Sequence, residues 1–95
     1  MELKNEKNIV SVKGNITCVN DFEEIKQSLE KIKEHHQNII LKIYDSLVIN
    51  SSLIGYLVKI VKQDGVNINL QAGNDILFEL LDDLGLSKTF NLQRL

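Results

Sequence analysis

The sequence predicts an α/β domain with a single mixed β-sheet of four to five strands and three main α-helices. Short β-branched or apolar segments alternate along the chain with longer segments whose apolar residues recur every three or four positions. Alternation at this spacing is typical of strand–helix–strand units joined by right-handed crossovers. The 95 residues suffice for one core, and no linker or repeat divides them, so residues 1–95 are expected to form one domain.

The first strand is expected at Ile9–Val12, which is rich in β-branched residues, and Leu3 lies in a polar lead-in that can pair beside it as an edge strand. Gly14-Asn15 then predicts a turn. The segment Asn20–Glu23 has the form of a capping box that opens a helix. An amphipathic stripe runs from there to about His35, through Phe22, Ile25, Leu29 and Ile32.

The middle of the chain predicts a second strand and a second helix. Ile39–Ile43 is an almost unbroken apolar run, typical of a strand that is covered on both faces. A helix is expected to begin near Ser51 and to stop at Gly65, which suits a helix C-terminus. Its wide apolar stripe contains Leu53, Ile54, Leu57, Val58, Ile60 and Val61.

The C-terminal third predicts strand, helix and strand again. Val66–Leu70 alternates with period two, which indicates a strand with one buried face. Asn74 is placed to cap a third helix and Gly85 to end it. The segment Thr89–Leu92 is expected to form a last short strand. The apolar side of the third helix would consist of Ile76, Leu77, Leu80, Leu81 and Leu84.

Composition argues against several classes of function. A net charge of −2 and only five aromatic residues, with no Trp, do not favour nucleic acid binding. Cys18 is the only cysteine, and neither the adjacent His35 and His36 nor the pair Asp82-Asp83 has partners in a metal-binding or catalytic pattern. We therefore expect no catalytic residues, no cofactor and no metal, and no enzymatic activity. No apolar run reaches the length of a membrane span and no signal peptide is evident, so a cytoplasmic protein is expected.

The most informative feature is Asn50-Ser51-Ser52, which stands where a strand or loop gives way to the second helix. Backbone N–H groups at a helix start have no partner within the helix and carry partial positive charge. A phosphate on a serine there is therefore tolerated, which suggests a phosphorylation switch. The same residue types also cap ordinary helices, so the position alone leaves both interpretations open.

The stretch from Ile40 to Gly55 resembles the central motif of the STAS domain family, the sulfate-transporter and anti-sigma-factor-antagonist domains. In that motif an apolar strand precedes an Asp-Leu-Ser-like turn, and a few residues later Asp-Ser-Ser-Gly-Leu-Gly opens a helix. Here the turn reads Asp45-Ser46-Leu47, and Asn50-Ser51-Ser52-Leu53-Ile54-Gly55 opens the helix. Gly14 and the ending Gly85-Leu86 also match. The likeness covers nearly the whole chain and is greatest to stand-alone bacterial anti-sigma factor antagonists.

The resemblance implies a non-catalytic module that binds an anti-sigma factor, itself a serine kinase, and so releases a sigma factor. Phosphorylation at the position of Ser52 would end this interaction, and a phosphatase would restore it. The implied partner-binding residues are Asn50, Ser51 and Leu53, beside the Gly14–Thr17 loop. The resemblance implies no cofactor in this chain, because ATP would belong to the partner.

Three residues depart from the motif, and two of them favour an alternative. Asn50 stands in place of Asp, Leu53 in place of Gly, and Thr17 in place of an early Asp. Leu53 would add bulk beside Ser52 and narrow the access of a kinase. Asn50 and Leu53 suit a STAS subunit that is not phosphorylated, such as the one attached to a lipid-transporting ABC complex. The oligomeric state is left open by the sequence.

Overall fold

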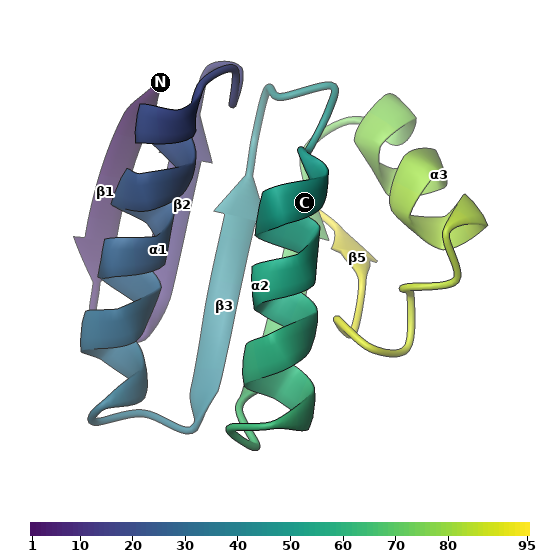
Figure 1. Ribbon diagram of the computed structural model, residues 1–95. Coiled ribbons are helices and arrows are strands. Elements are labelled where there is room, and N and C mark those ends of the chain that lie inside the picture. Colours follow the sequence, from purple (N-terminus) through teal and green to yellow (C-terminus); the bar gives the residue numbers. More distant parts are fainter.

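The computed structural model describes residues 1–95, which form five strands and three helices (Figure 1). All strands belong to one sheet in the order β1-β2-β3-β4-β5, in which β1 runs antiparallel to β2 and the other neighbours run parallel. The predicted fold is thereby confirmed. The elements are β1 (Glu2–Glu6), β2 (Ile9–Lys13), α1 (Val19–Lys33), β3 (Asn38–Ile43), α2 (Ser51–Lys62), β4 (Asn67–Ala72), α3 (Asp75–Asp83) and β5 (Gln93–Arg94).

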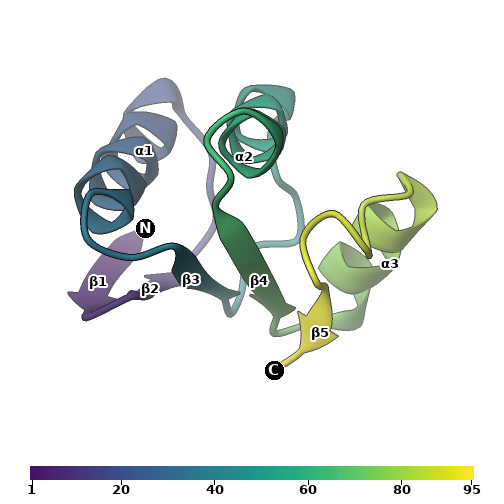
Figure 2. The same cartoon turned by 90° about the horizontal axis from the view of Figure 1, so that it is seen from below.

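The core lies between the sheet and the helices α1 and α2, which both cover the same face (Figure 2). Every second residue of the parallel strands points into it, as the period of a strand requires. On α1 and α2 the fully buried positions recur every three or four residues, as an amphipathic helix requires. The strand residues in this core are Val10, Val12, Ile39, Leu41, Ile43, Ile68, Leu70 and Ala72.

The expectation that β3 is covered on both faces is wrong. Ile39, Leu41 and Ile43 are buried under the helices, whereas Ile40 and Lys42 lie half-buried on the opposite face. The strand order explains the difference. Strands β2, β3 and β4 follow one another across the sheet in a single direction, so right-handed crossovers place their helices on the same side. The other face has no helix over it.

Two predicted element boundaries need correction. Helix α1 begins at Val19 with Cys18 as its N-cap, and the Asp21 carboxylate reaches back to accept from the backbone N–H of Thr17 at 2.9 Å. The capping box is therefore not the expected Asn20–Glu23. The last strand is not Thr89–Leu92, because these residues form turns that bury Phe90 completely, and β5 pairs only after them.

Helix α3 has the predicted ends. The Asn74 side chain accepts from the Leu77 N–H at 2.8 Å, and Gly85 follows the helix at φ = 75°. The Gly85 and Leu86 amides donate back to the carbonyls of Asp82 and Leu81, which is a Schellman motif. The predicted apolar side is only partly right, because Ile76 and Leu84 are more than half exposed.

Ser46 joins the loops at the carboxyl ends of β2, β3 and β4. Its side chain is fully buried, accepts from the Ile16 N–H at 3.1 Å and donates to the Val48 carbonyl at 2.7 Å. The Ser46 carbonyl accepts from Asn74 Nδ2 at 3.0 Å. One residue thus connects the loop before α1, the loop before α2 and the first turn of α3. None of the three helices has the length and apolar character needed to cross a bilayer.

Replacing Ser46 by Ala should lower the free energy of unfolding by about 1–3 kcal/mol, because the buried Ile16 N–H and Val48 carbonyl would each lose their partner. Urea denaturation measures the change. Ser11→Ala is the control, since the Ser11 hydroxyl makes no hydrogen bond in the structure, and it should alter stability by less than about 0.5 kcal/mol. Equal effects of the two substitutions would show that Ser46 is not a structural connection.

The same substitution at two glycines should have opposite effects. Gly55 lies within α2, where an added Cβ would meet nothing, so Gly55→Ala should stabilise the protein by about 0.5–1 kcal/mol. At Gly73 the added Cβ would lie 2.7 Å from the Tyr44 Cα, so Gly73→Ala should destabilise it by about 1–3 kcal/mol. Thermal unfolding of the two variants tests both signs, and a loss of stability in Gly55→Ala would mean that α2 packs more tightly than described.

Candidate functional site at the start of α2

Ser52 is exposed in the first turn of α2. Asn50 is the N-cap, and its side-chain oxygen accepts from the Leu53 N–H at 2.7 Å. The backbone N–H groups of Ser51 and Ser52 donate to no protein group, and the first turn contains no acidic residue. The positive end of the α2 dipole is therefore turned to solvent directly beside the Ser52 hydroxyl.

The starts of α1 and α2 border a depression of about 540 Å³, which we call the α1–α2 depression. The end of the loop before α1 and the first turns of α1 form one wall, and the N-cap and first turn of α2 form the other. Glu23 is the only charged residue in the lining, so the surface is mainly neutral. The lining consists of Thr17, Cys18, Val19, Phe22, Glu23, Asn50 and Ser52.

The two helix starts differ in how their positive ends are neutralised. At α1 the Asp21 carboxylate accepts from the backbone N–H groups of Thr17 and Cys18 at 2.9 and 3.4 Å. The hydrogen bond from the Thr17 backbone is the main reason why the pKa of Asp21 is lowered. Helix α2 has no such carboxylate. The first two amides of each helix donate to no protein group, but an anionic group in the depression would meet the Asp21 carboxylate at the start of α1 and no carboxylate in the first turn of α2.

Tyr56 holds α2 against α1 and so holds the α2 wall of the depression in place. Three residues of α1, spaced one helical turn apart, contact it. The Phe22 ring meets the Tyr56 ring edge-on at 6.3 Å, and Lys26 Nζ lies 5.7 Å from the ring centre. The Tyr56 hydroxyl donates to Glu30 Oε2 at 2.7 Å. Burial, reinforced by this bond, raises the pKa of Tyr56.

Lys33 extends this contact beyond the end of α2. Its ammonium group lies 2.6 Å from Glu30 Oε2 and 2.7 Å from Asp64 Oδ2. Hydrogen bonds to Asp64 and then to Glu30 raise the pKa of Lys33. The hydrogen bonds from Lys33 and then Tyr56 lower the pKa of Glu30. The network Tyr56–Glu30–Lys33–Asp64 therefore ties the two helices together from one turn after Ser52 to just beyond the end of α2.

The predicted site residues differ in their exposure to solvent. Ser51 and Ser52 are exposed and Asn50 is half-buried, as partner contact would require. The prediction that Leu53 binds a partner and narrows the access of a kinase is wrong. Its side chain is fully buried in the core and can do neither. Its position as the third residue of α2 turns it toward the sheet.

Of the Gly14–Thr17 loop, only Thr17 lines the depression. The Gly14 amide instead donates to the Asp45 side chain at 3.1 Å. Sequence reasoning missed four lining residues, which are Cys18, Val19, Phe22 and Glu23. Helical periodicity assigns Phe22 to the buried stripe of α1, but it cannot show that the end of this stripe stands opposite the start of α2.

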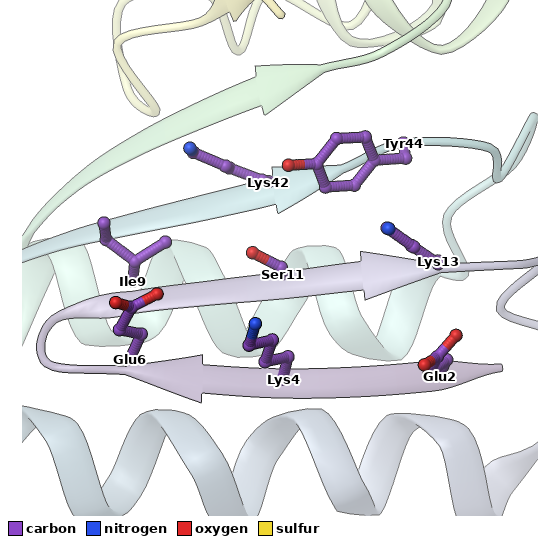
Figure 3. A pocket seen from close by; sticks show the side chains of 8 residues that line it. All are labelled: Glu2, Lys4, Glu6, Ile9, Ser11, Lys13, Lys42 and Tyr44. Atoms are coloured by element: carbon purple, nitrogen blue, oxygen red, sulfur yellow. The ribbon is translucent and has the colours of Figure 1, made fainter.

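The open face of the sheet forms another, smaller depression of about 250 Å³. Figure 3 shows its side chains, which project from β1, β2 and β3 away from the helices. Carboxylates and ammonium groups alternate along it, and Lys13 lies over the Tyr44 ring at 5.5 Å. Because neither sign of charge dominates, this face has the character of a solvated surface. Its lining is Glu2, Lys4, Glu6, Ile9, Ser11, Lys13, Lys42 and Tyr44.

Comparisons of this chain with protein-family models, with curated proteins and with solved structures found no match.

The Glu30 carboxylate should make stability depend on pH. Its pKa in the folded protein lies below the ordinary value of 4.5, so its contribution is complete above pH 4.5 and is lost as the pH falls through the lowered value. The difference in unfolding free energy between the native protein and Glu30→Gln should therefore be largest above pH 4.5 and shrink in acid. Urea denaturation over a pH series measures it.

Glu24→Gln is the matched control, because Glu24 is an exposed carboxylate on the same helix without an ion pair. The unfolding free energy of Glu24→Gln should stay near that of the native protein over the whole pH series. A Glu30→Gln difference that is constant with pH, or that grows in acid, would contradict the role given to the ionised Glu30.

Proposed function

We propose that this protein is a non-catalytic interaction module that acts in the bacterial cytoplasm as an anti-sigma factor antagonist. Its partner is an anti-sigma factor with serine kinase activity, and the surface that binds it is the start of α2 with the α1–α2 depression. Phosphorylation of Ser52 by this partner ends the interaction, and a phosphatase restores it. The proposal joins the STAS resemblance of the motif around Ser52 with the geometry of that motif.

The observation that carries the proposal is the exposed Ser52 hydroxyl at the open positive end of α2. A kinase needs a serine that it can reach, and the product needs surroundings that tolerate a phosphate. A phosphate adds a charge of about −1.5 to −2, and the free amides of Ser51 and Ser52 are suitable donors for it. The modification is thus compatible with the folded domain.

The same phosphate would oppose a docked partner. It would lie in the lining of the depression, where the only other charge is the negative Glu23, and so would change a nearly neutral surface into an anionic one. A partner surface that fits the unmodified serine would then meet added bulk and an added charge that it does not neutralise.

Two departures from the STAS motif leave this mechanism intact. Leu53 is directed into the core and does not hinder a kinase. Asn50 lacks the carboxylate of the family's Asp but keeps a side-chain oxygen that caps α2. The absence of a carboxylate there also leaves the positive end of α2 without a competing charge, which favours a phosphate on Ser52.

The unmodified protein should bind the anti-sigma factor kinase of its own organism, and incubation with that kinase and ATP should place phosphate on Ser52. Mass spectrometry locates the phosphate, and calorimetry measures binding. Ser52→Asp should weaken the complex by about tenfold or more, because charge and bulk enter the contact, while Ser52→Ala should change affinity far less. Cys18 lines the same depression, so its thiol should react more slowly with a thiol reagent in the complex.

Ser51→Ala is the control for the modification, because it leaves Ser52 available. Phosphate on neither serine, with binding retained, would remove the switch but not the antagonist function. Loss of both phosphorylation and binding would favour the subunit of a different assembly. Equal affinities of the Ser52→Asp and Ser52→Ala proteins would show that the partner does not bind at this surface.

A further inference from the structure

Helix α3 carries an apolar row on its outer side, formed by Ile76, Leu80 and Leu84, which we call the α3 ridge. The spacing of four residues aligns these side chains along one face of the helix. Ile76 is 59% exposed and Leu84 is 54% exposed, while Leu80 is half-buried. The opposite face already anchors the helix, because Leu77 and Leu81 are fully buried. Leu80 packs in part against the core, whereas Ile76 and Leu84 are apolar surface that the domain leaves exposed.

The ridge has acidic borders. The segment Asp75–Asp83 contains four carboxylates and no Lys or Arg, in a chain whose net charge is −2, so the remaining residues together carry +2. Asp75 is paired with Arg94, and Asp82 accepts from the Ser87 hydroxyl. Glu79 and Asp83 have no such partner and occupy the helical row next to the ridge.

The carboxylates at the C-terminal end of α3 are unfavourable for the stability of the helix. Carboxylates near a C-terminus face the negative end of the helix dipole, and the last turn of α3 has no basic residue to offset them. A cation brought against Asp83 from outside would relieve this arrangement. The charges thus indicate the sign of the surface that would cover the ridge.

Exposed apolar residues continue beyond the helix. Leu47 and Val48, which are 46% and 56% exposed, lie in the loop between β3 and α2. The hydrogen bond from Asn74 Nδ2 to the Ser46 carbonyl holds this loop next to the first turn of α3. Exposed apolar residues bordered by charges are typical of a protein interaction site.

We propose that the α3 ridge docks a protein partner that presents an apolar groove edged by lysine or arginine. A second copy of this chain is a poor occupant, because a symmetric contact through α3 would bring two sets of carboxylates together. Anionic lipid and nucleic acid would be repelled in the same way. A basic protein groove is the complementary surface.

This docking surface is separate from the one proposed to be switched by Ser52. In Figure 1 helix α3 stands beyond β5, at the opposite end of the sheet from α1. The α1–α2 depression is instead lined by the starts of α1 and α2. The inference goes beyond the proposed function and does not depend on it, since it uses no property of Ser52 or of the STAS motif.

The test uses short synthetic helices as probes of the partner's chemistry, with the isotopically labelled full chain observed by NMR. An amphipathic helix of leucine and lysine should shift the amide signals of α3 and of the Leu47-Val48 loop in a saturable way. Helices in which glutamate replaces lysine, or serine replaces leucine, should bind at least about tenfold more weakly. Equal binding of either control helix would overturn the proposal.

Matched variants locate the site. Ile76→Gln combined with Leu84→Gln should weaken binding of the leucine–lysine helix by about tenfold or more, and the exposure of both residues should let this variant keep its fold, as circular dichroism can verify. Val19→Gln removes an even more exposed apolar residue, on α1, and should leave binding unchanged. Ser52→Asp should also leave it unchanged.

Two outcomes would contradict the assignment. Binding that responds to Val19→Gln or Ser52→Asp would belong to the α1–α2 depression instead. Self-association of the free protein that Ile76→Gln with Leu84→Gln abolishes, measured by light scattering, would show that a second copy covers the ridge.

Discussion

The arrangement of both proposed surfaces depends on one buried side chain, that of Ser46. A buried hydroxyl is stable only when its hydrogen bonds are made, and Ser46 makes them to the loops on either side of it. Its carbonyl holds the first turn of α3 through Asn74. Close backbone contact between Gly73 and Tyr44 leaves no room for a side chain at the same edge. The starts of α2 and α3 are therefore held by one connected set of loop contacts.

The order of the strands explains why the functional features gather at that edge. Parallel strands that follow one another in a single direction place their crossover helices on one face and the starts of those helices at the carboxyl end of the sheet. The α1–α2 depression lies at this edge because the starts of the two neighbouring helices line it, and the contact between Tyr56 and Phe22 holds the helices together beside it. The open face of the sheet is another consequence of the strand order.

Much of this could be predicted from local sequence signals. Strand alternation, the apolar stripes of α1 and α2, the Asn74 cap and the Gly85 stop are short-range effects that neighbouring residues determine. Features that depend on residues distant in the sequence could not be predicted in this way. Regular pairing with β4 begins at Gln93 and not at the predicted Thr89–Leu92, because those residues form a turn that buries Phe90.

The site illustrates the same limit. Its motif indicated where α2 begins but not which way each residue points. A wide apolar stripe does not say that Leu53 is directed inward, or that Gly55 has open space around it. Likewise, the five apolar positions of α3 exceed what one face of a helix at the sheet edge can bury, so Ile76 and Leu84 remain outside. Only the packed structure separates the anchoring residues from the available ones.

The separation between residues that hold α2 in place and residues that are exposed also determines which properties a phosphate on Ser52 could change. The interactions that hold α2 in place are the Asn50 cap, the buried Leu53 and the Tyr56 contacts with α1, and none of them uses the Ser52 side chain. A modification there would alter the charge and shape of the depression while the fold stays the same. In the proposed switch, phosphorylation would therefore act on docking and not on folding, and the α3 ridge would remain available in both states.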